Sequence, residues 1–156
     1  MENYVLKSLS EDYAKEICSW KYEGEYSIYN FSDWDVVVKN KWDLSIKEKR
    51  ELEFIAILLN SELVAYGRVS EKEDKAVIGI SLKPSFCGKG HGKDIMKLLV
   101  RECIRRFPKY PITLEVRSFN KRAINCYESI GFKIKDKYMK STFDGGVDEF
   151  YYMEFK

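Results

Sequence analysis

The sequence predicts a mixed α/β fold with three α-β-α layers around a mixed, mostly antiparallel sheet of six to seven strands. Three β-rich runs, residues 54–59, 63–70 and 76–82, follow one another across short polar turns, as in an antiparallel meander. A helical stretch then separates the third run from a strand at 112–116, which is typical of a β-α-β unit. The sheet is therefore expected to combine antiparallel and parallel neighbours.

The first third of the chain predicts one strand and two helices. Residues 5–9 form the strand, and Ser10 is the expected N-cap of a helix that stops near Trp20. Residues 21–31, KYEGEYSIYNF, follow neither the helical nor the strand period and predict an ordered loop. The second helix follows this loop, with Ser32 as its expected N-cap.

The long helix of the β-α-β unit is predicted from its apolar spacing. It begins near Lys93 and ends before Pro108. Its expected apolar stripe consists of Ile95, Leu98, Leu99, Cys103 and Ile104. Turn residues at 60–62 and the segment EKEDK separate the strands that precede it.

The last elements are a helix and two strands. Asn120 begins a helix that runs to Ile130, and Gly131 terminates it. Two closing strands, 132–139 and 147–155, are expected on either side of a turn. That turn contains Asp144, Gly145 and Gly146.

Composition indicates a cytoplasmic protein with one domain, residues 1–156. The chain is 45% apolar and 15% aromatic, which is too hydrophobic for a disordered protein. Its longest apolar run, 54–59, is much shorter than the roughly 20 residues that cross a bilayer. The net charge is only +2 and basic residues alternate with acidic ones, so neither a membrane nor nucleic acid is an expected partner.

Cysteine and histidine usage gives no sign of a disulfide or a metal site. Cys18, Cys87, Cys103 and Cys126 form no C-x-x-C pair, and His91 is the only histidine. Reactive groups are therefore expected among tyrosine, glutamate, aspartate and cysteine side chains and the backbone.

A glycine-rich loop before the long helix predicts an anion site. Gly88, Gly90 and Gly92 alternate between a strand and a helix, so backbone N–H groups are available at the positive end of the helix dipole. Lys89 and Lys93 add positive charge. The alternative is a flexible turn with solvated lysines.

Two common phosphate ligands do not fit this loop. A P-loop needs a lysine followed by Ser or Thr to hold magnesium, whereas Asp94 follows Lys93 here. The dinucleotide fingerprint G-x-G-x-x-G is also absent, because the spacing is G-x-G-x-G. ATP and NAD are therefore disfavoured.

Two sequence blocks resemble the GNAT superfamily of N-acyltransferases. IGISLKPSFCGKGHGKDIMKLLV is similar to its acyl-CoA signature, in which R/Q-x-x-G-x-G/A leads into a helix, although Cys87 replaces the usual Arg or Gln. LEVRSFNKRAINCYESIGF, residues 114–132, is similar to its N-x-x-A-x-x-x-Y-x-x-x-G-F block and to ribosomal-protein N-terminal acetyltransferases. The resemblance implies the GNAT fold, with the sheet splayed between the strands at 76–82 and 112–116, and acetyl-CoA as co-substrate without a metal.

The resemblance also implies where the coenzyme binds. Pantetheine is expected to pair with the strand backbone, and an N–H near Leu82 to polarise the thioester carbonyl. Asn120 is expected to contact pantetheine or to cap the helix. The implied cofactor-binding residues are Ile80, Ser81, Leu82, Cys87, Gly88, Lys89, Gly90, His91, Gly92, Lys93, Asn120, Ala123 and Tyr127.

Tyr127 and Glu115 are the expected catalytic residues. A phenol with a pKa of about 10 suits protonation of the leaving thiolate, and a base is needed because an alkyl ammonium, with a pKa of about 10.4, is not nucleophilic at pH 7. The alternatives are a packing role for Tyr127 and pairing of Glu115 with Arg117 or Lys133. Ser81, or waters between Glu23 and Glu25, are further choices for the base.

Other mechanisms and functions stay open at this point. A covalent acyl-enzyme on a cysteine is less favoured, since Cys103 and Cys126 are expected in the core and direct transfer is usual in the resembled family. A non-catalytic acyl-CoA-binding regulatory module with the same fold is the main alternative to an enzyme. An acyl carrier or a nucleotide-binding protein that uses the glycine loop alone is a further one. Both monomer and homodimer are compatible with the sequence.

The expected acceptor is an amine of a small molecule or a peptide. In the resembled fold, the loop at 20–31 would cover the acyl end of the coenzyme as a lid. Its acidic and aromatic side chains favour an ammonium through ion pairing and cation–π contact. The expected substrate-binding residues are Tyr22, Glu23, Glu25, Tyr26 and Tyr29. The alternative is a packed surface loop.

Overall fold

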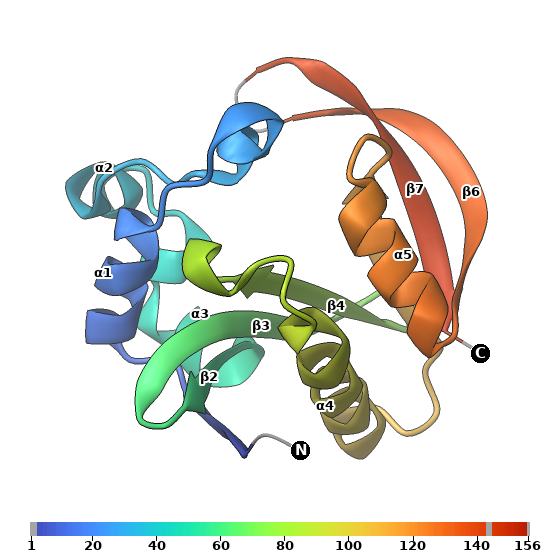
Figure 1. Cartoon of the computed structure of the whole chain (residues 1–156), viewed down its shortest axis with the longest axis horizontal. Coiled ribbons are helices and arrows are strands. Elements are labelled where there is room, and N and C mark those ends of the chain that lie inside the picture. The colour runs from blue at the N-terminus through green and yellow to red at the C-terminus, as the bar shows by residue number, and fades with distance from the viewer. Residues whose placement is uncertain (1–2, 143–144, 156) are drawn as a thin grey trace. The chain divides into compact units, whose positions relative to one another are not determined.

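The computed structural model describes residues 3–142 and 145–155, and within them seven strands form one sheet (Figure 1). The strand order is β1-β2-β3-β4-β5-β7-β6. The strands are β1 (Tyr4–Ser8), β2 (Phe54–Leu59), β3 (Glu62–Lys72), β4 (Lys75–Leu82), β5 (Ile112–Arg117), β6 (Phe132–Ser141) and β7 (Val147–Phe155). The mixed α/β class and the mostly antiparallel, seven-stranded sheet agree with the prediction.

Eight helical segments accompany the sheet in the same described residues. The α-helices are α1 (Glu11–Ser19), α2 (Trp34–Lys39), α3 (Lys47–Glu53), α4 (His91–Arg106) and α5 (Lys121–Ile130). The 3₁₀ helices are η1 (Gly24–Tyr29), η2 (Asp43–Ser45) and η3 (Pro84–Phe86). None of the described helices is long and apolar enough to cross a lipid bilayer.

The chain divides into two compact units, and the division passes through β3 and β4. The first unit comprises the chain up to Val69 together with Ile80–Lys89. The second comprises Ser70–Gly79 and the chain from Gly90 onward.

The first unit is built around the antiparallel strands β1 and β2 and helix α1. Tyr4 pairs with Leu59 at one end of the β1–β2 ladder and Ser8 with Ile55 at the other. Ser10 caps α1 as predicted, since its hydroxyl accepts a hydrogen bond of 3.1 Å from the Tyr13 N–H. The buried face of α1 joins a core cluster of Leu9, Ala14, Ile17, Cys18, Trp20, Val37, Leu44, Phe54, Ala56, Leu58 and Leu63.

Two details of this unit differ from the prediction. The N-cap of α2 is Asp33 rather than Ser32, because the Val36 and Val37 N–H groups both donate to the Asp33 carbonyl. The turn after β2 has two residues rather than three. Asn60 and Ser61 both take positive φ, and Glu62 already belongs to β3.

Helix α3 was not predicted from the sequence. Its seven residues, KEKRELE, contain one apolar side chain, Leu52, which is 70% exposed. The buried member is instead Arg50. This helix therefore has no apolar stripe of its own, and it packs through tertiary contacts with η2 and β2.

In the second unit, β4 and β5 pair in parallel, and β5, β7 and β6 pair antiparallel. The parallel register joins Ala76 to Ile112 and Val77 to Thr113, at the beginning of both strands. β6 is two residues longer than predicted, and the part of the predicted turn at Asp144 lies outside the described residues. Helices α4 and α5 contact each other, and α5 also contacts β6 (Figure 1).

Helix α4 begins two residues earlier than predicted, at His91, and buries a different stripe. Its buried residues are Ile95, Met96, Leu99, Val100 and Cys103. The prediction that Ile104 faces the core was wrong, since this side chain is 50% exposed. Leu98 is only half-buried. Met96 and Val100 lie four residues apart, in a row beside that of Ile95, Leu99 and Cys103, and these two adjacent rows form the buried face.

Candidate active site

The glycine-rich loop ends in the left-handed backbone that only glycine adopts readily. Gly88 has φ of +73° and Gly90, the N-cap of α4, has φ of +86°. A Cβ added at either position would meet nothing within 4 Å, so both residues face open space. The first N–H groups of the 16-residue helix α4 have no partner within the helix, and its dipole favours an anion there.

The first turn of α4 contains three of the predicted cofactor-binding residues. His91 and Gly92 are half-buried there, and Lys93 is exposed. Lys89 is exposed in the preceding loop. The first turn of α4 can therefore offer backbone N–H groups and the Lys93 ammonium to a phosphate ligand.

Cys87 turns back toward the end of β4 instead of extending along the loop. Its thiol donates to the Leu82 and Lys83 carbonyls at sulfur–oxygen distances of 3.8 and 3.7 Å. In place of the usual long Arg or Gln side chain, this position therefore has a short thiol that contacts the backbone.

The end of β4 is held by one side-chain and one backbone hydrogen bond from within the first unit. The Tyr22 hydroxyl donates to the Leu82 carbonyl at 2.5 Å. The Lys83 N–H donates to the Val64 carbonyl at 2.8 Å, so this amide is already engaged. Ile80, Ser81 and Leu82 are all half-buried.

Tyr66 also belongs to this region, although no sequence motif indicated it. Burial raises the pKa of its phenol, and a hydrogen bond with the Ser81 side chain offsets part of that rise. Its ring contacts Trp20 and Phe54, with centroid distances of 6.2 and 6.1 Å. The strand period of β3 places Tyr66 on the same face as Val64 and Arg68, but only strand register brings it to Ser81.

The predicted acceptor loop is ordered, and part of it is the 3₁₀ helix η1. Asn30 closes the loop, because its side chain accepts from the Tyr22 N–H at 2.7 Å and donates to the Tyr22 carbonyl at 3.3 Å. The Lys21 ammonium bridges the Cys18 and Phe31 carbonyls at 3.0 and 2.8 Å. This segment is thus a closed loop, tied to β4 through Tyr22.

The other predicted acceptor residues lie on the exposed side of this loop. Glu23, Glu25 and Tyr29 are exposed, and Tyr26 is half-buried. Carboxylates and aromatic rings are therefore accessible to solvent on η1 and the residue before it.

Helix α5 carries Asn120, Ala123 and Tyr127. Asn120 caps the helix, because its side-chain oxygen accepts from the Ala123 N–H at 3.2 Å. Tyr127 is half-buried, and its ring centroid lies 6.1 Å from that of Phe132. Asn120 and Tyr127 therefore lie two helical turns apart along the same helix, as their spacing predicts.

Glu115 lies on β5 and is bound by two residues of β6. Its carboxylate accepts from the Lys140 ammonium at 2.6 Å and from the Tyr138 hydroxyl. Burial acts to raise the pKa of Glu115, but the hydrogen bonds from Lys140 and Tyr138 outweigh it and hold that pKa below its usual value. The partners are thus neither Arg117 nor Lys133. Arg117 instead pairs with Asp148 at 3.3 Å.

The cysteine thiols differ in burial. Cys103 is fully buried, as predicted, and burial raises its pKa to about 12. Cys126 is half-buried rather than fully enclosed, and burial raises its pKa while Lys93 lowers it. Neither thiol is thus poised to form a thiolate nucleophile near neutral pH.

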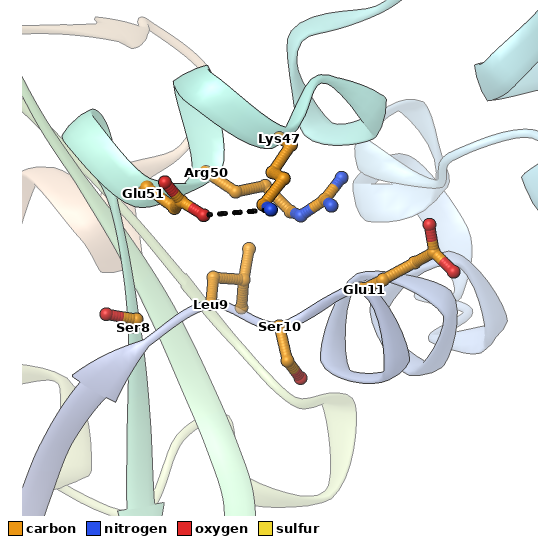
Figure 2. Close-up of a pocket in the computed structure, with 7 residues that line it drawn as sticks. All are labelled: Ser8, Leu9, Ser10, Glu11, Lys47, Arg50 and Glu51. Carbon is orange, nitrogen blue, oxygen red and sulfur yellow. Dashed lines mark ion pairs between the residues drawn. The ribbon is translucent and has the colours of Figure 1, made fainter.

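A hollow of about 430 Å³ lies elsewhere in the first unit (Figure 2). Its lining consists of Ser8, Leu9, Ser10, Glu11, Lys47, Arg50 and Glu51. None of the predicted site residues is among them.

Comparisons with known proteins agree with the fold and the motifs. Residues 11–132 match the model of the acetyltransferase (GNAT) family. No curated protein sequence matches the chain.

Among solved structures, a chimera of the Vibrio cholerae spermidine N-acetyltransferase SpeG and hSSAT aligns with a TM-score of 0.78 and 17% identity, over 97% of this chain and 94% of that one. The Escherichia coli ribosomal-protein-S18-alanine N-acetyltransferase aligns with a TM-score of 0.68 and 21% identity, over 98% and 93%. YncA, a putative acetyltransferase from Salmonella typhimurium solved with its cofactor acetyl-CoA, aligns with a TM-score of 0.70 and 18% identity, over 98% of this chain and 93% of that one.

The structural similarities establish the fold, and the family match covers most of the chain, including residues of both compact units. The chain therefore belongs to the acetyltransferase (GNAT) family.

Proposed function

We propose that this protein transfers the acetyl group of acetyl-CoA to a primary amine of a small molecule or peptide, by direct attack in a ternary complex. The observation that carries the proposal is the glycine loop, which presents left-handed Gly88 and Gly90 in open space at the start of α4. The family match at residues 11–132 supports a single domain with this activity.

The coenzyme would be bound by the backbone of the loop and by flanking lysines. N–H groups of the first turn of α4 suit the pyrophosphate, and Lys89 and Lys93 supply the charge that Cys87 does not. Asn120 would contact pantetheine through its amide nitrogen, since its oxygen accepts the helix-capping bond from Ala123. Ile80, Ser81 and Leu82 would line the pantetheine arm.

Backbone at the end of β4 would stabilise the developing oxyanion. Acetyl-CoA supplies a thioester whose carbonyl carbon accepts the amine while the carbon–sulfur bond breaks. The Lys83 N–H is engaged by Val64, so we assign the polarising donor to the Leu82 N–H. The bond from Tyr22 to the Leu82 carbonyl would fix the orientation of this strand end.

Tyr127 would be the proton donor and Glu115 the proton acceptor of the reaction. The Tyr127 phenol donates a proton to the departing thiolate. Glu115 is the proposed base for the ammonium, and its lowered pKa keeps it ionised near neutral pH. It would act through water, because its oxygens already accept from Tyr138 and Lys140 but retain further lone pairs.

The acceptor is proposed to be a cationic amine held by the loop that contains η1. Exposed Glu23, Glu25 and Tyr29 and half-buried Tyr26 offer carboxylates and ring faces to an ammonium. Tyr22 would act as the anchor of this loop rather than as a direct contact, because its hydroxyl is bound to Leu82. The names of two structural neighbours, a spermidine and an S18-alanine acetyltransferase, also favour an amine.

Isothermal titration calorimetry tests the coenzyme site. Acetyl-CoA should bind wild-type protein and Mg-ATP should not, and Gly90→Val should abolish binding of acetyl-CoA because a branched side chain would occupy the phosphate approach. Gly145→Val is the matched control, since Gly145 has a similar φ of +89° and also faces open space. Tighter binding of Mg-ATP than of acetyl-CoA, or equal loss in both variants, would contradict the assignment.

A further inference from the structure

The hollow in the first unit is lined by two short stretches of chain. Ser8, Leu9, Ser10 and Glu11 come from the end of β1 and the start of α1, and Lys47, Arg50 and Glu51 come from α3 (Figure 2). No role in the proposed acetyl transfer is assigned to any of these residues.

Arg50 is a buried cation on α3 that contacts a backbone carbonyl. It is 6% exposed, and its Nη1 donates to the Leu44 carbonyl at 3.1 Å. No ion pair between Arg50 and a carboxylate occurs in the part of the chain that the structure describes. The guanidinium carries a positive charge, and its other nitrogen atoms are not among the buried atoms of the described residues that lack a hydrogen-bond partner.

The other charged groups around the hollow have partners of their own. Lys47 pairs with Glu51 at 3.9 Å (Figure 2), and Glu11 pairs with Lys15 at 3.5 Å. Arg50 is therefore the charged lining residue that has no ion-pair partner in the part of the chain that the structure describes. Buried Leu9 adds an apolar wall beside these groups.

We infer that this hollow is a binding site for a small monocarboxylate. With Nη1 bound to Leu44, the edge formed by Nε and Nη2 is the one whose fork geometry matches the two oxygens of a carboxylate. One uncompensated positive charge matches one negative charge, whereas the carboxylates of Glu11 and Glu51 oppose a polyanion. Leu9 suits a short apolar tail on the ligand.

A titration followed by amide chemical shifts tests this site. The probe is sodium propionate, with ionic strength held constant by sodium chloride, and the matched neutral probe is propionamide. Propionate should shift amides of residues 8–11 and 47–51 in a saturable manner, while propionamide should not. Saturating acetyl-CoA should leave the propionate response unchanged, because no proposed coenzyme residue lines the hollow.

Substitution of the guanidinium should then remove the response. Arg50→Gln keeps a donor for the Leu44 carbonyl but no charge, and it should weaken propionate binding at least tenfold. Arg105→Gln is the control, because Arg105 is an exposed arginine of α4, and this variant should bind propionate as the wild type does.

The inference is overturned by any of three results on the wild-type protein, which do not depend on a folded variant. These are absence of saturable shifts in the two segments, an equal response to propionamide, and tighter binding of inorganic phosphate than of propionate. A folded Arg50→Gln variant that binds propionate normally would also overturn it.

Discussion

Tyr127 is the residue whose substitution most directly separates chemistry from binding. Tyr127→Phe keeps the ring that contacts Phe132 and removes only the hydroxyl. If the phenol protonates the leaving thiolate, kcat should fall roughly 100-fold with little change in acetyl-CoA affinity. Steady-state kinetics and calorimetry measure the two quantities, and Tyr110→Phe on the half-buried ring stacked on Phe107 is the control. Unchanged turnover would assign Tyr127 a packing role.

The pKa of Glu115 is lowered in the folded protein, and this predicts that its contribution to folding stability depends on pH. A carboxylate with a lowered folded pKa stabilises the fold above the unfolded value of about 4.3, and this contribution is lost as pH falls through the folded pKa. Glu115→Gln should therefore cost stability at pH 7, by up to about 1 kcal/mol for a partly exposed pair, and much less at pH 3. Urea unfolding at the two pH values measures this difference.

The same variant distinguishes a catalytic Glu115 from a purely structural one. A lost base should lower activity more at pH 7 than at pH 9, where more of the amine is already unprotonated. Lys140→Met is the control, because it removes the 2.6 Å ion pair but keeps the carboxylate. Equal loss of activity at both pH values in Glu115→Gln would contradict the catalytic role.

At the scale of elements, helix caps give the sharpest test. Asn120 caps α5 and Ser10 caps α1, so replacement of either residue by alanine should cost about 1 kcal/mol of folding free energy. Asn120→Asp should retain this stability, since aspartate caps equally well, but should weaken acetyl-CoA binding by loss of the amide donor. Chemical denaturation and calorimetry measure the two effects. Unchanged affinity in Asn120→Asp would leave the residue with a capping role only.

Elements with a strong local signal could be predicted from sequence. β2 was predicted with its observed bounds, and β5 and α5 within one residue, because apolar runs and cap residues mark them. Helix α3 could not be predicted, since its buried residue is Arg50 and its apolar residue, Leu52, is exposed. The helical period alone also assigned Ile104 to the wrong side of α4.

Site residues divide in the same way. The glycine loop and the cap at Asn120 are local motifs, and their positions were predictable. The partners of Glu115, by contrast, lie on β6, with Lys140 25 residues away, and the Tyr22 hydroxyl reaches Leu82 over 60 residues. Such contacts depend on strand register and on loop closure, which sequence periodicity does not encode.

For the whole molecule, the central claim is acetyl transfer to an amine. The measurement is release of coenzyme A thiol from acetyl-CoA in the presence of a panel of polyamines, lysine derivatives and peptides with free N-termini, with the acetylated product identified by mass spectrometry. We predict that at least one primary amine gives saturable thiol release, with one acetylated product per thiol. Binding of acetyl-CoA without thiol release above the amine-free rate for any acceptor would contradict the claim and indicate a non-catalytic acyl-CoA-binding module.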